Sequence, residues 1–254
     1  MPIRTHNDLL DRVANNFWLS QPIWGETQVS TTTLLGGTMA RQSLGFSKVL
    51  PNPLPTGVTN YFVTAFNTTE ASNATALLAK IVNLGSIDIS GASGTFTDGS
   101  AMPTVTELGV SRVTSSAVIA EVTTALNSAP GSISITYVDQ DGNAAEATTA
   151  QALGASAVVK SCGMINLNSG DVGVRDITAS SRSGGTTPTG VLRFLGIIPV
   201  SMINFFGGST SSDNLVTAGF NLPKLGAGDE LRVFVLGANA AKCIYGNIFV
   251  VGNN

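Results

Sequence analysis

The segment SISITYVDQDGN, residues 132–143, decides the fold class. From Ser132 to Val138 polar and apolar side chains alternate, which is the period of a strand with one buried face. Asp141-Gly142 then supplies a pair of residues favoured in tight hairpin turns. The segment therefore predicts a β-hairpin that packs one face on a hydrophobic core.

Similar runs recur along the chain and indicate an all-β protein. These runs are rich in residues that favour strands. They lie at residues 61–66, 87–90, 191–198, 230–236 and 244–251. Residues 74–84 and 116–126 contain enough Ala and Leu for short helices, but their β-branched residues favour strands. Clusters of Gly and Ser separate the runs, which predicts a jelly-roll-like β-sandwich.

The first 57 residues have a different pattern. Leu9, Leu10, Val13 and Phe17 recur at helical spacing, and the proline-rich stretch at residues 51–55 favours an extended hinge. The sequence therefore predicts an N-terminal helical or extended arm over residues 1–57 and a β-sandwich body over residues 58–254. Two alternatives stay open: the helix packs on its own body, and the body divides near residue 150 into two smaller sandwiches.

The chain carries little charge. It has 13 Lys and Arg and 16 Asp and Glu, 11% of the residues, where an ordinary domain has about 25%. The net charge of −3 provides no basic field for nucleic acid. The most apolar stretch, residues 191–206, is interrupted by Arg193, Pro199 and Asn204 and is shorter than the about 20 residues of a membrane span. We expect neither nucleic acid nor membrane as a partner, and no signal peptide.

Residue types for catalysis or metal binding are scarce. His6 is the single histidine, so a Ser-His-Asp triad or a zinc site lacks further ligands. Cys162 and Cys243 lie far apart in the sequence and are expected as reduced, partly buried thiols, with a disulfide between them as the open alternative. The acidic turn at residues 139–143 departs from a calcium loop, which needs Gly at its sixth position and Glu at its twelfth. We expect no catalytic residue, metal, cofactor or small-molecule substrate.

A pair of acids for sugar hydrolysis is the enzymatic alternative, because the two carboxylates of such a site meet only in space. The candidates are Glu26, Glu70, Glu107, Glu121 and Glu146. Each is expected as a solvated acid on a strand face. The chain is therefore predicted not to be an enzyme.

Two motifs resemble a known family. The strand and turn ITYVDQDGN, residues 135–143, resemble the "(V/I)TYT(N/D)QDG" segment of a family of tailed-bacteriophage virion proteins. The stretch LNSGDVGV, residues 167–174, is similar to that family's "LQAGD(T/S)GV" segment. The resemblance covers roughly residues 58–205. It departs from the family's pattern at Ala144-Ala145-Glu146, where the relatives have a Gly-Arg pair.

The resemblance implies a structural virion protein of the head decoration or cement type, which bridges neighbouring capsid subunits on the capsid surface after assembly in the host cytoplasm. Its implied partners are the major capsid protein and its own copies, as a homotrimer or homodimer. Apolar and aromatic anchors are the usual binding hot spots, so the predicted partner-binding residues are Leu9, Leu10, Val13, Phe17, Trp18 and Trp24. A tail, baseplate or receptor-binding module is the alternative.

Overall fold

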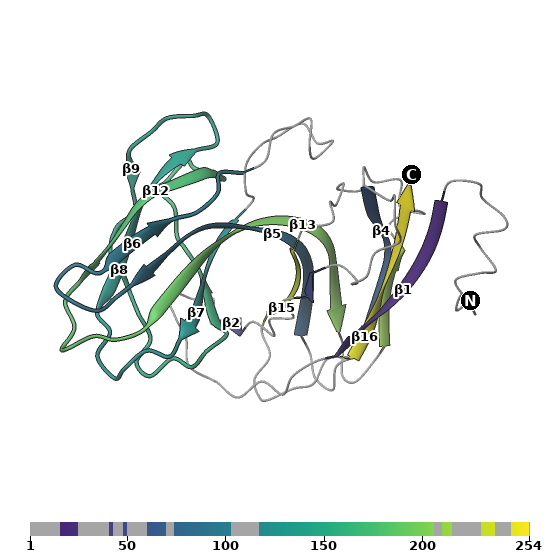
Figure 1. Ribbon diagram of the computed structural model, residues 1–254, viewed down its shortest axis with the longest axis horizontal. Coiled ribbons are helices and arrows are strands. Elements are labelled where there is room, and N and C mark those ends of the chain that lie inside the picture. The colour runs from purple at the N-terminus through teal and green to yellow at the C-terminus, as the bar shows by residue number, and fades with distance from the viewer. Residues whose placement is uncertain are drawn as a thin grey trace.

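The computed structural model is built from antiparallel β-strands (Figure 1). It describes residues 16–24, 41–42, 48–49, 60–69, 74–102, 117–205, 210–214, 230–236 and 245–253, with side chains over 79–102 and 117–199 and at Glu230 and Arg232. Helices are absent from these ranges, so none of the described residues belongs to a helix able to cross a membrane. The predicted all-β class is confirmed.

The described strands follow one another along the chain. They are β1 (Asn16–Trp24), β2 (Arg41–Gln42), β3 (Lys48–Val49), β4 (Asn60–Thr69), β5 (Ala74–Asp88), β6 (Thr95–Asp98), β7 (Ala117–Thr124), β8 (Ser132–Asp139), β9 (Glu146–Ala147), β10 (Gln151–Ala152), β11 (Ser161–Met164), β12 (Val174–Ser183), β13 (Val191–Phe205), β14 (Thr210–Asn214), β15 (Glu230–Leu236) and β16 (Tyr245–Asn253). Residues 74–84 and 116–126, for which the sequence allowed helix or strand, lie largely in β5 and β7. The strand interpretation is therefore confirmed.

Two sheets enclose the main core. One has the order β10-β8-β12, with β9 also paired to β8, and it packs on β5, β7 and β13 of a larger sheet. Every second residue of β8 is buried, and Ile133, Ile135 and Tyr137 reach the same core as Leu84 and Phe194. This is the alternation from which the hairpin was predicted, and the β-sandwich is confirmed.

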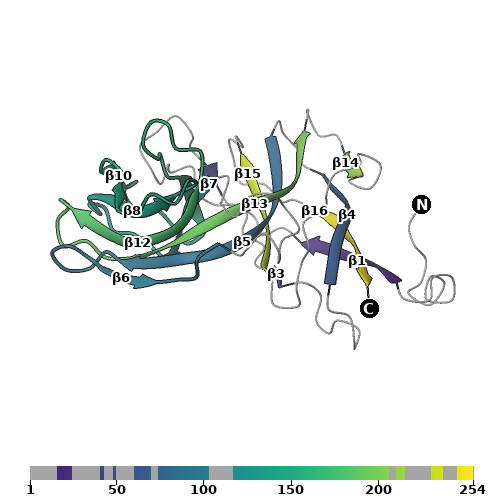
Figure 2. The same cartoon turned by 90° about the horizontal axis from the view of Figure 1, so that it is seen from above.

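The larger sheet closes into a ring. Its order is β3-β15-β2-β11-β7-β13-β5-β6, and β15 also pairs with β5, so that β15, β2, β11, β7, β13 and β5 form a closed circuit. A second group of buried side chains belongs to this ring: Ala79, Ile81, Ile119, Cys162, Leu195 and Ile197. The long strands β5 and β13 extend from beside β12 to beside β15 (Figure 2) and thus serve both the sandwich and the ring.

A third sheet has the order β1-β16-β4-β14. β1 pairs with β16 along its whole length, from Asn16 opposite Asn253 to Trp24 opposite Tyr245. The helical spacing that included Phe17 was therefore wrong at that residue. Aromatic and apolar residues of β1 favour a strand, and its place at the sheet edge accommodates Pro22, which has no N–H to donate.

The domain boundaries stay predictions. The proline-rich hinge and residues 1–15 lie outside the described residues. The alternative prediction divided the body into two sandwiches near residue 150. β8, which precedes that residue, pairs with β12, which follows it, so strands from both sides of the predicted boundary belong to one sheet.

Candidate functional site

The predicted partner-binding residues fall into two groups. Phe17, Trp18 and Trp24 lie on β1, at the edge of its sheet. Leu9, Leu10 and Val13 lie outside the described residues. The aromatic group therefore belongs to a strand, whereas the apolar group stays a prediction.

The two sequence motifs, residues 135–143 and 167–174, meet at one end of the sandwich. Tyr137, on β8, is fully buried, and its hydroxyl donates a hydrogen bond to the Asp171 carboxylate. The same hydroxyl oxygen accepts a hydrogen bond from the backbone N–H of Asn168 at 3.1 Å. Tyr137 therefore fastens the first motif to the loop that carries the second.

Gln140 makes a second set of bonds between the motifs. Its side-chain Oε1 accepts the backbone N–H groups of Val172 at 3.0 Å and of Gly173 at 3.3 Å. The Arg175 guanidinium donates to the Gln140 carbonyl from Nε at 3.0 Å and from Nη2 at 2.7 Å. The two motifs are thus one interlocked unit, comprising residues 137–147 and 165–175, which we call the motif unit.

Asp139 shapes the hairpin turn of this unit. Its Oδ1 accepts the N–H groups of Asp141 and Asn143, and its Oδ2 accepts the Asn143 side chain, all at 2.8 Å. Gly142 has φ +92°, which only glycine adopts easily. Burial opposes ionisation of Asp139, but the bonds from Asn143, Asp141 and Gly142 together outweigh it and lower the pKa of Asp139. The turn interpretation of this segment is confirmed.

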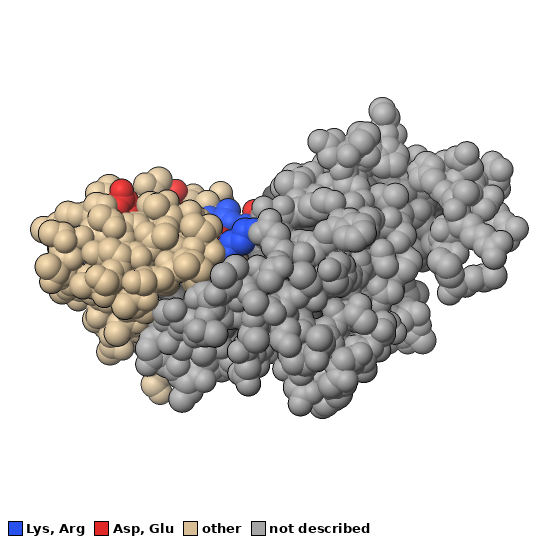
Figure 3. Space-filling model, turned by 90° about the horizontal axis from the view of Figure 1, so that it is seen from below, with Lys and Arg blue, Asp and Glu red and all other residues tan. Residues whose placement is uncertain are grey.

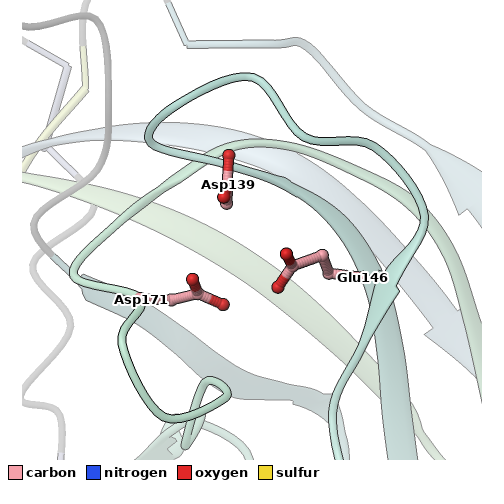
Figure 4. Close-up of side chains that lie close together, drawn as sticks. All are labelled: Asp139, Glu146 and Asp171. Atoms are coloured by element: carbon pink, nitrogen blue, oxygen red, sulfur yellow. The ribbon is translucent and has the colours of Figure 1, made fainter.

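Three carboxylates converge in the motif unit (Figure 4). Oxygens of Asp139, Glu146 and Asp171 all lie within 4.8 Å of one another. The pKa of Glu146 is raised, first by its hydrogen bond with Asp171 and then by burial. Burial, followed by the bond to Asp171, raises the pKa of Tyr137 to about 12. We call Tyr137, Asp139, Glu146 and Asp171 the acidic cluster.

Carboxylates of the acidic cluster accept hydrogen bonds from neighbouring protein groups. Asp139 is bonded to its own turn and Asp171 to Tyr137. Acidic groups at such spacing are common without an ion, and we assign them no metal. Sequence reasoning treated Glu146 as an isolated acid and missed the grouping. The signal that could have found it is the pairing of the two motifs, because Asp139 lies in one and Asp171 in the other.

A second charged group lies inside the ring. Glu121 on β7 is only 3% exposed and Arg232 on β15 only 4%. Glu121 forms ion pairs with Arg232 and, at 2.9 Å, with Arg193. Glu230 pairs with Arg232 at 2.7 Å and lies 3.8 Å from Arg193. β7 and β15 are on opposite sides of the ring, so this ionic network, as we call it, spans the interior.

Two of the five candidate acids for catalysis, Glu121 and Glu146, lie among the described residues. Glu121 was expected to be solvated, and this was wrong, because it is buried between two arginines. Glu146 is half-buried in the motif unit. Glu26, Glu70 and Glu107 lie outside the described residues.

Comparisons with known proteins identify no family. No protein-family model matches the chain, and a search of curated proteins finds no match. Among solved structures, one match is a structure of the infectious bursal disease virus Gt strain. It is 9% identical and covers 94% of this chain and 81% of that chain, with a TM-score of 0.21. The infectious bursal disease virus VP2 subviral particle gives 8% identity and a TM-score of 0.20 over the same shares. TM-scores this low do not establish a common fold.

Proposed function

We propose that the chain is a non-enzymatic structural protein of a virus particle, of the type that decorates a capsid and bridges neighbouring subunits. One observation carries the proposal: the described surface is poor in charge. The chain has few charged residues, and several of them are buried: Lys80, Glu121, Asp139, Arg182 and Arg232. Charges are correspondingly sparse on the described part of the face in Figure 3.

A surface of this kind suits contact with other proteins. Among the side chains of residues 79–102 and 117–199, the charged residues in the exposed class are Asp88, Asp98, Asp141 and Arg175. Ordering a Lys or Glu at an interface costs up to about 2 kcal/mol in side-chain freedom, and Ser or Thr costs less. A protein that is isolated in solution gains from more surface charge than this. A protein covered by neighbours does not need it.

The motif unit supports the same proposal. Its residues resemble those of phage virion proteins, and Tyr137, Gln140 and Arg175 use their polar atoms to brace two loops. That is a structural use of the motif residues. The partners proposed are the major capsid protein and further copies of this chain, on the capsid surface after assembly in the host cytoplasm.

Immunogold electron microscopy tests the location. An antibody raised against the chain is applied to purified particles of the virus that encodes it. We expect gold over the heads, at a density set by the number of copies. Gold confined to the tail or baseplate would overturn the decoration role, and unlabelled particles that lack the chain by mass spectrometry would overturn the virion role altogether.

A pair of truncations tests the arm. Removal of residues 1–15 keeps β1, whereas removal of residues 1–25 also deletes one of the two strands that pair with β16. We expect the shorter truncation to abolish binding to purified capsids in a co-sedimentation assay while the far-UV circular dichroism of the chain is unchanged. Normal binding by that truncation would exclude Leu9, Leu10 and Val13 as anchors.

A further inference from the structure

We propose that Asp98 is a site of spontaneous modification, at which the backbone nitrogen of Gly99 attacks the Asp98 carboxyl group and converts the residue into isoaspartate. The same dipeptide occurs at a second place, Asp141-Gly142, and the contacts of the two pairs assign the reaction to the first pair and not to the second. The inference concerns the chain itself and is independent of the role proposed in the particle.

The first observation is the contact inside the Asp98-Gly99 pair. Asp98 ends β6, and its Oδ1 accepts the Gly99 N–H at 2.9 Å. The nitrogen that attacks and the carboxyl group that is attacked are therefore already in contact. A reaction gains rate when folding has brought its two groups together in this way.

The second observation is that the fold requires glycine after Asp98. A Cβ on Gly99 would lie 2.3 Å from the Asn83 carbonyl oxygen and 2.3 Å from the Gly85 nitrogen, both on β5. No side chain fits such a close approach of two backbones. The absence of a side chain also leaves the Gly99 nitrogen unhindered for ring closure.

The reaction needs no component other than water. The Gly99 nitrogen bonds to Cγ of the protonated Asp98 carboxyl group, whose hydroxyl leaves as water with the hydrogen of the Gly99 N–H. Water then opens the resulting succinimide ring. Opening at Cγ returns aspartate, whereas opening at the backbone carbonyl gives isoaspartate, in which the main chain runs through the former side chain. Both residues are exposed, so water reaches the ring.

The Asp141-Gly142 pair has the opposite arrangement. The Gly142 N–H donates to the Asp139 carbonyl at 3.3 Å. The Asp141 carboxylate accepts the Gln140 side chain at 3.1 Å. Nitrogen and carboxyl group are thus each bonded to another residue. We therefore expect this pair to react slowly while the chain is folded, although the dipeptide is the same.

Isomerisation at Asp98 also alters a joint between the two sheets of the sandwich. The Ser100 N–H donates to the Asn83 carbonyl of β5 at 2.8 Å. The Met102 N–H donates to the Arg175 carbonyl of β12 at 2.9 Å. Isoaspartate adds one carbon atom to the main chain just before these two bonds. Both bonds should therefore weaken in the modified chain.

Peptide mapping tests the assignment. The folded chain is incubated at physiological temperature in mildly acidic buffer, and isoaspartate is quantified by mass spectrometry with electron-transfer fragmentation, which distinguishes the two isomers of equal mass. We expect at least about tenfold more isoaspartate at residue 98 than at residue 141, because rates depend steeply on the placement of the reacting groups. Equal amounts at the two positions, or none at residue 98, would overturn the proposal.

The same incubation in concentrated guanidinium chloride is the control. Unfolding removes the hydrogen bonds of both pairs, so the two identical dipeptides should react at similar rates. A preference for residue 98 that persisted in the unfolded chain would belong to the local sequence, and the assignment to the folded contact would be wrong.

Two matched variants identify the attacked group. Asp98→Glu keeps the charge but would have to close a larger ring, which forms far more slowly, so product at residue 98 should disappear. Asp141→Glu should leave the product at residue 98 unchanged. Isomerisation at residue 98 that continued in Asp98→Glu would contradict the proposed attack.

Hydrogen exchange of the parent chain tests the effect on the joint. The isoaspartate form is separated from the unmodified form by ion-exchange chromatography, and the backbone amides of Ser100 and Met102 are compared in the two forms. We expect both amides to lose protection in the isoaspartate form. Unchanged protection of both would overturn the proposed weakening of the joint.

Discussion

The ionic network in the ring and the acidic cluster in the motif unit both gather charged residues from distant parts of the chain, but they balance charge in different ways. The network pairs Glu121 and Glu230 with Arg193 and Arg232. The acidic cluster places three acids together. A balanced group holds its geometry by attraction, whereas a group of like charges depends on hydrogen bonds from its neighbours. We therefore expect the network to determine stability and the cluster to determine the response to pH.

The largest expected effect is from Glu121→Leu in the network. This change leaves Arg232 buried with Glu230 as its remaining ion-pair partner and removes the 2.9 Å partner of Arg193. Breaking a buried pair in this way costs about 3–5 kcal/mol, because a desolvated charge is left uncompensated. The free energy of unfolding from urea titration measures the loss.

The control for this change is the double variant Glu121→Leu/Arg232→Met. Replacing both members of a buried pair with apolar residues is often close to neutral, so most of the loss should be recovered. If the single variant lost less stability than Tyr137→Phe, the network would not be the stabilising group of the two.

An intermediate effect is expected from Tyr137→Phe in the acidic cluster. The ring still fills the core, but Asp171 loses a donor and the Asn168 N–H loses an acceptor. Unsatisfied buried groups cost about 1–3 kcal/mol. The free energy of unfolding near neutral pH should fall by this amount.

The pH dependence of Tyr137 has its own sign. Because its pKa is raised to about 12, the bonded hydroxyl stabilises the folded chain up to the ordinary value of about 10. That contribution is lost as pH rises from there towards about 12. Ultraviolet absorbance titration of the three tyrosines should show a late component that is missing in Tyr137→Phe. Titration of all three at the ordinary value would contradict the burial of this hydroxyl.

The two regions were not equally visible in the sequence. Alternation in residues 132–138 predicted β8 and its buried face, because a strand's period is local. The contact of Glu121 with Arg232 could not be predicted, since it depends on a ring closed by pairing between β15 and β5. Phe17 was assigned to a helix because its spacing fits one, but pairing with β16 prevails over that local pattern. The motif unit lies between these cases: both motifs were recognised, and only the fold brings Tyr137 to Asp171.

A smaller effect is expected from Gln140→Ala. The change removes the acceptor of the Val172 and Gly173 N–H groups, but Val172 is exposed, so water can replace its lost bond. We expect a loss of about 1 kcal/mol, with faster hydrogen exchange at Val172 and Gly173 and little change elsewhere. Asp141→Asn, in the same turn, is the matched control and should leave these amides unchanged.

The smallest expected effect has the opposite sign and concerns the backbone before Glu146. Ala145 has φ +64°, a left-handed conformation that costs a residue with a Cβ about 1–2 kcal/mol. Ala145→Gly removes this strain but adds flexibility to the unfolded chain, so we expect a net gain of about 0.5–1 kcal/mol. Ala144 is not among the residues with positive φ, and Ala144→Gly should therefore destabilise the chain slightly. Equal effects of the two substitutions would contradict a strained turn. A gain in stability confined to Ala145→Gly would mean that backbone strain, as well as like charge, opposes the position of Glu146 in the acidic cluster. The ionic network, in which opposite charges are paired, does not have this energetic cost.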